Sequence, residues 1–343
     1  MSIVLKRNYE IYISKSNSAP YTQSNTVKIL VKDFDFNQSA NIDKASRETL
    51  DPLQERTVDP FVSLVSPVTF SLTTYILPLV DTNVTSPEEY LWLSLLGNEA
   101  GISNNPTTST INFAQGNVGS LHELTLWFRD PNNTDSSYRI DNAIIDSATI
   151  NFDINNIAEI EWKGRALSMT RDTPPTAGNF TPRDNEIDYL KTRLSTISLE
   201  LGGATTYTVA LTGGSINFEN NNTFHNRTQL GQTTVPVGHY TGNREITGDL
   251  DFYLKQGVNL SADLYEALRS YPISSDTYET SQYANITIII GGTATTVPRI
   301  ELNVPLAILN LPTINFEEAL TMQVPFTAKE GTGTYSTINY KAQ

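Results

Sequence analysis

The chain has 343 residues, of which 38% are hydrophobic and 17% charged, and its formal net charge is −14. The acidic excess argues against binding to DNA grooves or anionic membranes, because both require a basic surface. The absence of cysteine excludes a disulfide framework and thiolate chemistry. No apolar run has the length of a membrane-spanning helix, and the N-terminus lacks the apolar segment of a signal peptide, so we expect a product made in the cytoplasm.

Short runs rich in Ile, Val, Thr, Tyr and Phe, separated by Gly, Pro, Asn and Asp, predict a mostly β chain. A short helix is expected over residues 86–96, because Ser86 and Glu89 form a capping box and Gly97 is placed to end the helix. Residues 37–60 read as a long irregular excursion between two strands. The expected strands of the first half cover residues 9–14, 27–36, 65–77, 123–129 and 138–145, with a closing hairpin at 149–166.

The second half repeats this order of elements. Ile-Asn-Phe occurs at 150–152 and again at 314–316, and a recurring unit of this length predicts an internal duplication. The expected elements are strands 196–201 and 207–218, an excursion at 220–243, a strand at 244–254, a helix at 261–271, strands 286–290 and 299–308, and a hairpin at 313–329. We therefore predict a first β domain at 1–166, a linker at 167–194, a second β domain at 195–330 and a C-terminal tail at 331–343.

Motifs of catalysis and cofactor binding are absent from the sequence. It contains no Gly-rich phosphate loop and no nucleophile elbow, and its three histidines lack the spacing of metal ligands. The pairs Asp33/Asp35 and Asp249/Asp251 resemble metal-binding DxD pairs, but each lies within an alternating strand. We therefore expect no enzyme activity, no metal and no cofactor.

The acidic residues of several expected strands share one face. Along each of these strands a carboxylate or amide alternates with an apolar residue, as in Phe34, Phe152 and Trp162, which predicts one buried and one polar face. Lys32, Lys163 and Arg165 are the basic exceptions. On spacing alone, the polar face is equally consistent with the solvated outside of a β-sandwich.

A strand pair, a very long excursion, a returning strand, one short helix and a closing hairpin resemble the tail tube subunit of long-tailed bacteriophages. The order 27–36, 37–60, 65–77, 86–96 and 138–166 carries this resemblance, and 207–218, 220–243, 244–254, 261–271 and 299–329 carry it a second time. The resemblance implies two tandem tail-tube-like β-sandwich or barrel units, each with one short α-helix and a long stacking loop. Most members of that family have one unit and form sixfold rings, so a duplicated chain implies rings of three subunits.

The resemblance also implies partners and site residues. Inner strands of neighbouring subunits would form a continuous barrel, rings would stack through the long loop, and DNA would pass through the lumen without specific binding. Other tail proteins would contact the tube ends, and the product would reside in the virion tail. The channel-lining residues would then be Asp33, Asp35, Asp153, Glu159, Glu161, Glu219, Glu245, Asp249, Asp251 and Glu317. The ring-stacking residues would be Arg47, Leu50, Leu53, Arg56, Leu230 and Val235.

A two-domain β-sandwich that binds glycans, such as a surface adhesin, is the alternative. Glycan-binding modules present exposed aromatic platforms, whereas Trp92, Trp127 and Trp162 occupy positions with apolar periodicity and are expected in the core. The tail-tube interpretation is therefore preferred.

Overall fold

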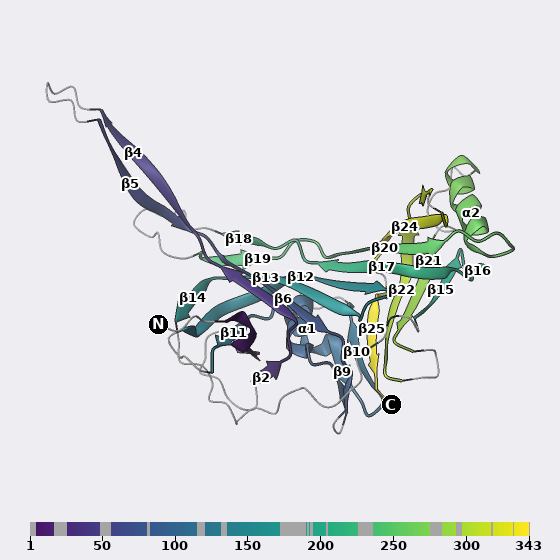
Figure 1. Cartoon of the computed structure of the whole chain (residues 1–343), viewed down its shortest axis with the longest axis horizontal. Helices are drawn as coiled ribbons and strands as arrows, with labels where there is room; N and C mark the ends of the chain where they lie inside the picture. Colours follow the sequence, from purple (N-terminus) through teal and green to yellow (C-terminus); the bar gives the residue numbers. More distant parts are fainter. Residues whose placement is uncertain are drawn as a thin grey trace.

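In the computed structural model, the described part of the chain consists of antiparallel β-structure with two α-helices, which confirms the mostly β fold class (Figure 1). The structure describes residues 5–16, 26–48, 56–80, 83–114, 121–131, 136–171, 190, 192, 195–203, 205–225, 236–274, 283–292, 297–316, 318–331 and 333–342.

The elements follow one another along the chain in two halves. The first half contains η1 (Lys6–Asn8), β1 (Glu10–Ser14), β2 (Thr26–Ile29), β3 (Asp33–Asn37), β4 (Ala40–Glu48), β5 (Arg56–Val65), β6 (Val68–Tyr75), β7 (Leu79–Val80), β8 (Val84–Thr85), α1 (Glu89–Leu96), η2 (Glu99–Gly101), β9 (Ile102–Asn104), β10 (Thr108–Asn112), β11 (Leu124–Arg129), β12 (Tyr138–Asp153), β13 (Glu159–Ala166) and β14 (Ser168–Arg171). The second half contains β15 (Thr196–Leu201), β16 (Thr205–Tyr207), β17 (Ala210–Glu219), β18 (Thr223–His225), β19 (Gly238–Tyr240), β20 (Glu245–Tyr253), α2 (Ser261–Ser274), β21 (Tyr283–Ile290), β22 (Arg299–Leu309), β23 (Thr313–Asn315), β24 (Thr321–Ala328) and β25 (Thr337–Lys341).

One antiparallel layer, which we call the inner sheet, runs through both halves. Its strand order is β3–β6–β13–β12–β17–β20–β24–β23. The two halves join where β12 pairs with β17, with Ile150 opposite Ile216. The halves therefore share a sheet instead of standing as separate units along the chain.

A second layer backs the inner sheet. In the first half β2, β1, β11 and the first part of β12 pair in that order, and β14 pairs with the other edge of β12. In the second half the order is β16–β15–β21–β22–β25–β10–β9. Strand β14 thus lies within the expected linker, and β25 lies within the expected tail. Because β25 pairs with β22 and with β10, the C-terminal segment is a second connection between the halves.

The strand pairings of the two halves correspond. In the backing layer, β1–β11 corresponds to β15–β21, and β11–β12 corresponds to β21–β22. In the inner sheet, β12–β13 corresponds to β23–β24, β6–β13 to β20–β24, and β3–β6 to β17–β20. At one equivalent pair of positions, a phenylalanine and the glycine that faces it are exchanged between the two strands. Phe70 on β6 faces Gly164 on β13, whereas Gly248 on β20 faces Phe326 on β24. An added Cβ would lie 2.3 Å from Phe70 Cζ at Gly164 and 2.6 Å from Phe326 Cε1 at Gly248, so each glycine leaves room for the opposing ring.

The hydrophobic core is continuous across the two halves. Trp92 of α1 lies at its centre, with its ring centroid 4.6 Å from that of Trp162 and 5.7 Å from that of Phe218. Its indole Nε1 donates a hydrogen bond to the hydroxyl of Tyr340 on β25, at 2.9 Å. All residues of helix α1 from Tyr90 to Leu96 are buried, because strands of both halves surround the helix.

The C-terminal end of α1 is held by side chains of the second half. Gly97 ends the helix in the left-handed conformation, with φ 75°, as expected. Arg244 Nη2 donates to the carbonyl oxygens of Leu95 and Leu96, both at 3.0 Å, and Asn220 Nδ2 donates to that of Leu95 at 2.8 Å. A cation at this end also complements the helix dipole, so Arg244 couples α1 to the second half of the chain.

The first excursion was expected to be irregular, and that expectation is wrong. Most of it forms a two-stranded hairpin, which we call the arm, in which β4 pairs with β5 from Ala40–Val65 to Glu48–Arg56. Figure 1 shows the arm projecting far beyond the sheets. Its many charged residues hid the alternation of a strand. The second excursion contains a much shorter hairpin, in which β18 pairs with β19. Both hairpins lie at the same end of the inner sheet, because β3 and β17 run in the same direction.

We predict that Arg244→Ala lowers the free energy of unfolding by about 2–3 kcal/mol, because the buried carbonyl of Leu96 loses the donor Arg244 and that of Leu95 keeps Asn220 but loses Arg244. Urea-induced unfolding measures this change. Arg269→Ala is the matched control, since Arg269 is exposed on α2 and pairs with Glu266 at 2.9 Å; its expected effect is below about 0.5 kcal/mol. Equal effects of the two substitutions would contradict the coupling role of Arg244.

Candidate channel-lining surface

One face of the inner sheet is polar across all its strands, and we call it the polar face. Strand alternation places Asp33 and Asp35 of β3 opposite Thr73 and Ser71 of β6, while Phe34 and Phe36 turn to the core side. The same alternation holds on β13, where Ile160 and Trp162 are buried between Glu159, Glu161 and Lys163. The register then carries the polar face across the junction from β12 to β17 and on to β20 and β24.

The strands bring together the predicted channel-lining residues that the structure describes. Nine of the ten lie on this single face: Asp33, Asp35, Asp153, Glu159, Glu161, Glu219, Glu245, Asp249 and Asp251. Glu317 lies outside the described residues.

Basic side chains on or beside the polar face bond to neighbouring carboxylates. Lys32 Nζ lies 2.6 Å from Glu159 Oε1, and Lys163 Nζ lies 3.1 Å from Glu161 Oε1. Arg165 bonds to Asp146 and donates through Nη2 to the carbonyl oxygen of Asn222, at 2.5 Å. These pairs neutralise part of the face, and the carboxylates of β12 and β20 keep the remainder acidic.

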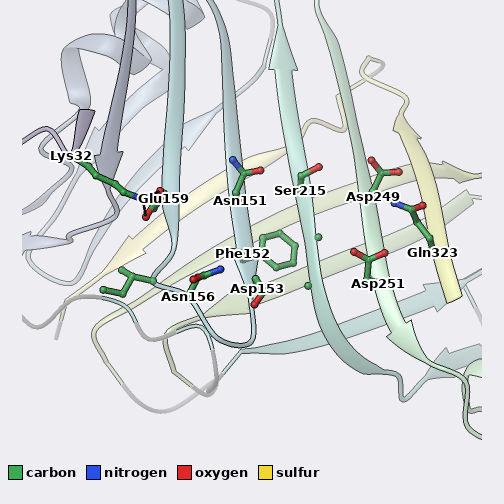
Figure 2. A pocket seen from close by; sticks show the side chains of 13 residues that line it. Lys32, Asn151, Phe152, Asp153, Asn156, Glu159, Ser215, Asp249, Asp251 and Gln323 are labelled. Atoms are coloured by element: carbon green, nitrogen blue, oxygen red, sulfur yellow. Dashed lines mark hydrogen bonds and ion pairs between the residues drawn. The ribbon is translucent and has the colours of Figure 1, made fainter. Parts of the chain in front are cut away.

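A hollow of about 420 Å³ lies in the middle of the polar face, lined by residues of both halves. Figure 2 shows Asn151, Ser215 and Asp249 side by side on β12, β17 and β20, with Asp153 and Asp251 below them. Gly213 lies opposite both Asp153 and Asp251. Because this glycine has no side chain, it leaves the space between the two carboxylates open.

Carboxylates around the hollow repel one another. Burial raises the pKa of Asp251, and the neighbouring charges of Asp249 and Asp153 raise this pKa further. In the described part of the chain, no group of three His, Cys, Asp or Glu side chains is arranged to hold a metal ion. The hollow is therefore a concentration of negative charge that favours cations in a general way.

Sequence reasoning missed three kinds of residue on this face. Gln323 of β24 and Ser215 of β17 line the hollow, and the same period-two alternation that identified the carboxylates would have found them. Gly213 was missed because a glycine contributes space and gives no periodic signal.

Two of the six predicted stacking residues, Arg47 and Arg56, lie in the arm. Arg47 lies opposite Thr57 and Arg56 lies opposite Glu48 in the arm, whereas Leu50, Leu53, Leu230 and Val235 lie outside the described residues. The arm instead exposes a different apolar set. Ile42, Val58, Phe61 and Val62 are each more than half exposed, and Ile42, Val58 and Val62 share one face of the hairpin.

No protein-family model matches the chain. Tail tube protein pb6 of Escherichia phage T5 is 27% identical to it over 352 aligned positions, which cover 96% of this chain and 73% of that protein. The chain is a homologue of a phage tail tube protein. The resemblance predicted from the order of the elements is thereby confirmed, and it extends over nearly the whole chain.

The glycan-binding alternative is not supported. Trp92, Trp127 and Trp162 are all buried, with at most 2% of their surface exposed, so no tryptophan provides a platform for a sugar ring.

None of the helices in the described part of the chain has the length and apolar character needed to span a bilayer.

We predict that Asp251→Asn raises the melting temperature of the unassembled subunit at pH 7. The raised pKa of Asp251 means that ionisation is harder in the folded than in the unfolded chain. The stability that Asp251 contributes in its protonated form is therefore fully present below the unfolded pKa of about 4. This stability is lost as the pH rises through the folded pKa, because the charged carboxylate is disfavoured in the folded chain. Asparagine carries no charge at any pH, so the variant does not lose this stability at pH 7 and should melt at a higher temperature than the wild type. Near pH 3 Asp251 is protonated in the wild type as well, so the difference in melting temperature should disappear. Thermal unfolding followed by circular dichroism between pH 3 and pH 7 measures it.

The matched control for this prediction is Asp35→Asn. It removes one charge from an exposed position of the same face, away from the hollow, and so tests whether the gain requires a carboxylate inside the hollow. A gain for Asp251→Asn that is equal at pH 3 and pH 7 would contradict the predicted electrostatic cause.

Proposed function

We propose that the chain is a structural subunit of a phage tail tube, and that it polymerises as stacked rings around an acidic channel for genome delivery. The observation that carries this proposal is the inner sheet, in which eight antiparallel strands from both halves form one polar, acidic face. Homology to the tail tube protein of phage T5 supports the same role. The role is mechanical, the chain needs no cofactor for it, and the protein is located in the virion tail.

The internal duplication and a ring of three subunits are part of this proposal. The corresponding strand pairings of the two halves and the exchanged Gly–Phe pairs support a duplication. Each chain then supplies two equivalent sectors to the ring, so three chains provide six sectors with pseudo-sixfold symmetry. Ring closure also pairs the edge strands of the inner sheet, and unpaired edges are otherwise prone to aggregation.

The polar face is proposed to line the channel. DNA carries one negative charge per ~1.7 Å of its axis, so a basic wall would bind it through counterion release. An acidic wall repels the DNA and prevents adhesion. The Debye length of roughly 8–10 Å in physiological salt confines this repulsion to DNA close to the wall, which is the range that matters in a narrow channel.

The arm is proposed to contact the next ring. It continues β3 and β6 beyond the end of the inner sheet, and a hairpin without further packing is only marginally stable in water. Its apolar side chains Ile42, Val58 and Val62 suit the centre of a contact, and its charged residues suit the rim. The short β18–β19 hairpin lies at the same end, so the two halves would contribute unequally to stacking. Other tail proteins would cap the ends of the tube.

We predict that the double substitution Asp249→Lys and Asp251→Lys leaves tube assembly intact and slows DNA ejection at low salt. The two lysines change the charge of each chain's wall by +4, so repulsion becomes attraction that weakens with added salt. Ejection kinetics of variant particles measured from low to high ionic strength test this. The control is Asp249→Asn with Asp251→Asn, which should slow ejection far less. Normal ejection by the lysine variant at low salt would refute the acidic-channel role.

We predict that wild-type protein at high concentration forms tubes in electron micrographs, whereas a variant lacking the arm forms single rings or subunits. In the variant an Asn-Gly turn replaces residues 41–64 and closes β3 onto β6, since this dipeptide favours two-residue hairpins. Circular dichroism should still show folded β-structure, because the arm packs little against the sheets. Long tubes formed by the variant would rule out the stacking role, and dispersed wild-type subunits would contradict the proposed function.

A further inference from the structure

The inner sheet has two open edges in the described part of the chain. At one edge β3 pairs with β6 alone, and at the other β23 pairs with β24 alone. Both edges carry apolar side chains. Phe34 and Phe36 of β3 pack against the core, Ile314 of β23 lies opposite the buried Met322, and Phe316 follows directly after β23. An open edge with apolar side chains requires a partner strand or a protecting charge.

The junction within the chain provides a template for that partner. At this junction Thr149–Phe152 of β12 pairs with β17, with Ile150 opposite Ile216 and Asn151 opposite Ser215. The same four residue types, Thr-Ile-Asn-Phe, recur at 313–316 on the open edge. The open edge of the second half is therefore built like the edge of the first half that is already paired.

The two phenylalanines of this repeated segment have opposite environments. Phe152 is 4% exposed, because its ring packs beside Gly214 of β17. Phe316 is 84% exposed. Both phenylalanines follow Thr-Ile-Asn, but β17 lies beside Phe152, whereas no strand of the described part of the chain lies beside Phe316.

The strand register fixes which residues would meet. The exchanged Gly–Phe pairs show that Phe70 of β6 and Gly248 of β20 occupy equivalent positions. Phe36 of β3 lies opposite Phe70, and Ile216 of β17 lies opposite Gly248. Phe36 is therefore the counterpart of Ile216. On the other strand, Ile150 lies opposite Ile160 and Ile314 lies opposite Met322, so Ile314 is the counterpart of Ile150. The repeated Thr-Ile-Asn-Phe segment gives the same equivalence independently.

We propose that β23 of one copy pairs antiparallel with β3 of a second copy, with Ile314 opposite Phe36, Asn315 opposite Asp35 and Phe316 opposite Phe34. This inference rests on the proposed ring and specifies its subunit contact. Phe316 then joins an aromatic group formed by Tyr9, Phe34 and Phe36, whose neighbouring ring centroids are 5.5 Å and 6.3 Å apart. Asn315 and Asp35 continue the polar face across the contact.

Lys6 protects this edge in the free subunit. Its Nζ bonds to Asp33 on the polar face and lies 5.1 Å from the ring centroid of Phe34 on the core side, so its side chain wraps around the end of β3. A lysine at an open edge opposes unspecific strand pairing. The specific contact therefore begins at Phe34 and continues toward Asn37.

Cysteine cross-linking tests the register, because the natural chain contains no cysteine. The test uses an Asp35→Cys, Asn315→Cys double variant, assembled and oxidised. Both side chains are exposed on the polar face of the free subunit, and directly opposed residues of antiparallel strands have the Cα spacing of a disulfide. Denaturing electrophoresis should show covalent dimers and trimers, with the ladder ending at three for a closed ring of three chains.

Two further variants are the controls. Asn151→Cys with Ser215→Cys occupies the equivalent positions of the internal junction and should form a disulfide within one chain. Asn37→Cys with Asn315→Cys is two residues out of register and should cross-link at least tenfold more slowly, since diagonal Cα atoms are roughly 7–8 Å apart. The proposed register is overturned if the out-of-register pair cross-links at the same rate as the pair at 35 and 315. It is also overturned if the pair at 35 and 315 forms no cross-link while the internal pair does. Tubes in the same preparation then leave the proposed function standing, whereas their absence from wild-type protein contradicts that function.

Phe316→Ser provides a second measurement. Phe316 is exposed in the free subunit, so the substitution should leave the subunit's melting temperature unchanged and raise the concentration needed for ring assembly by about tenfold or more. Phe152→Ser, at the equivalent internal position, should lower the melting temperature. Unchanged assembly by the Phe316 variant would overturn the proposed contact.

Discussion

Seven residue pairs between β12 and β17, from Ser147 opposite Glu219 to Asp153 opposite Gly213, join the two halves of the chain. This pairing makes one sheet out of two sets of strands, and it places Trp162 and Phe218 of different halves around Trp92. The burial of α1 follows from it, since strands of both halves are needed to cover the helix. The contact of Arg244 with the end of α1 also depends on this pairing. The continuous core and the continuous polar face are therefore two consequences of the same strand junction.

The polar face combines structural and electrostatic requirements. Its basic side chains are held beside carboxylates, as Lys32 is by Glu159, which limits repulsion along β13. Among the described residues, no basic side chain forms an ion pair with Asp153, Asp249 or Asp251 around the hollow, and burial together with the charges of Asp249 and Asp153 raises the pKa of Asp251. A surface shaped only for subunit stability would avoid this arrangement. The arrangement is consistent with the proposed acidic channel.

The free subunit leaves several surfaces without partners, and these surfaces differ in kind. The edges of the inner sheet offer backbone hydrogen-bonding groups together with Phe316 and Phe34, which suits lateral pairing within a ring. The arm projects away from the sheets (Figure 1). It exposes the side chains of Ile42, Val58 and Val62, which suits the proposed contact along the axis. In the proposed tube, lateral and axial assembly would therefore depend on separate residues, so substitutions could disrupt one without the other.

The sequence by itself determined the mostly β class, the short helix ending at Gly97, the repeated order of elements and the shared face of residues such as Asp35, Glu161 and Asp249. Each of these follows from local information, because alternation along a strand and capping at a helix end depend on residues close in the chain. The tertiary structure alone decided that β12 pairs with β17, that the C-terminal strand β25 lies between β10 and β22, and that α1 is buried on all sides. These outcomes depend on which apolar faces pack together across the halves, which no local pattern records. The arm was missed for a related reason: an isolated hairpin has little core, so its charged residues obscured the alternation of Ile42, Val58 and Val62.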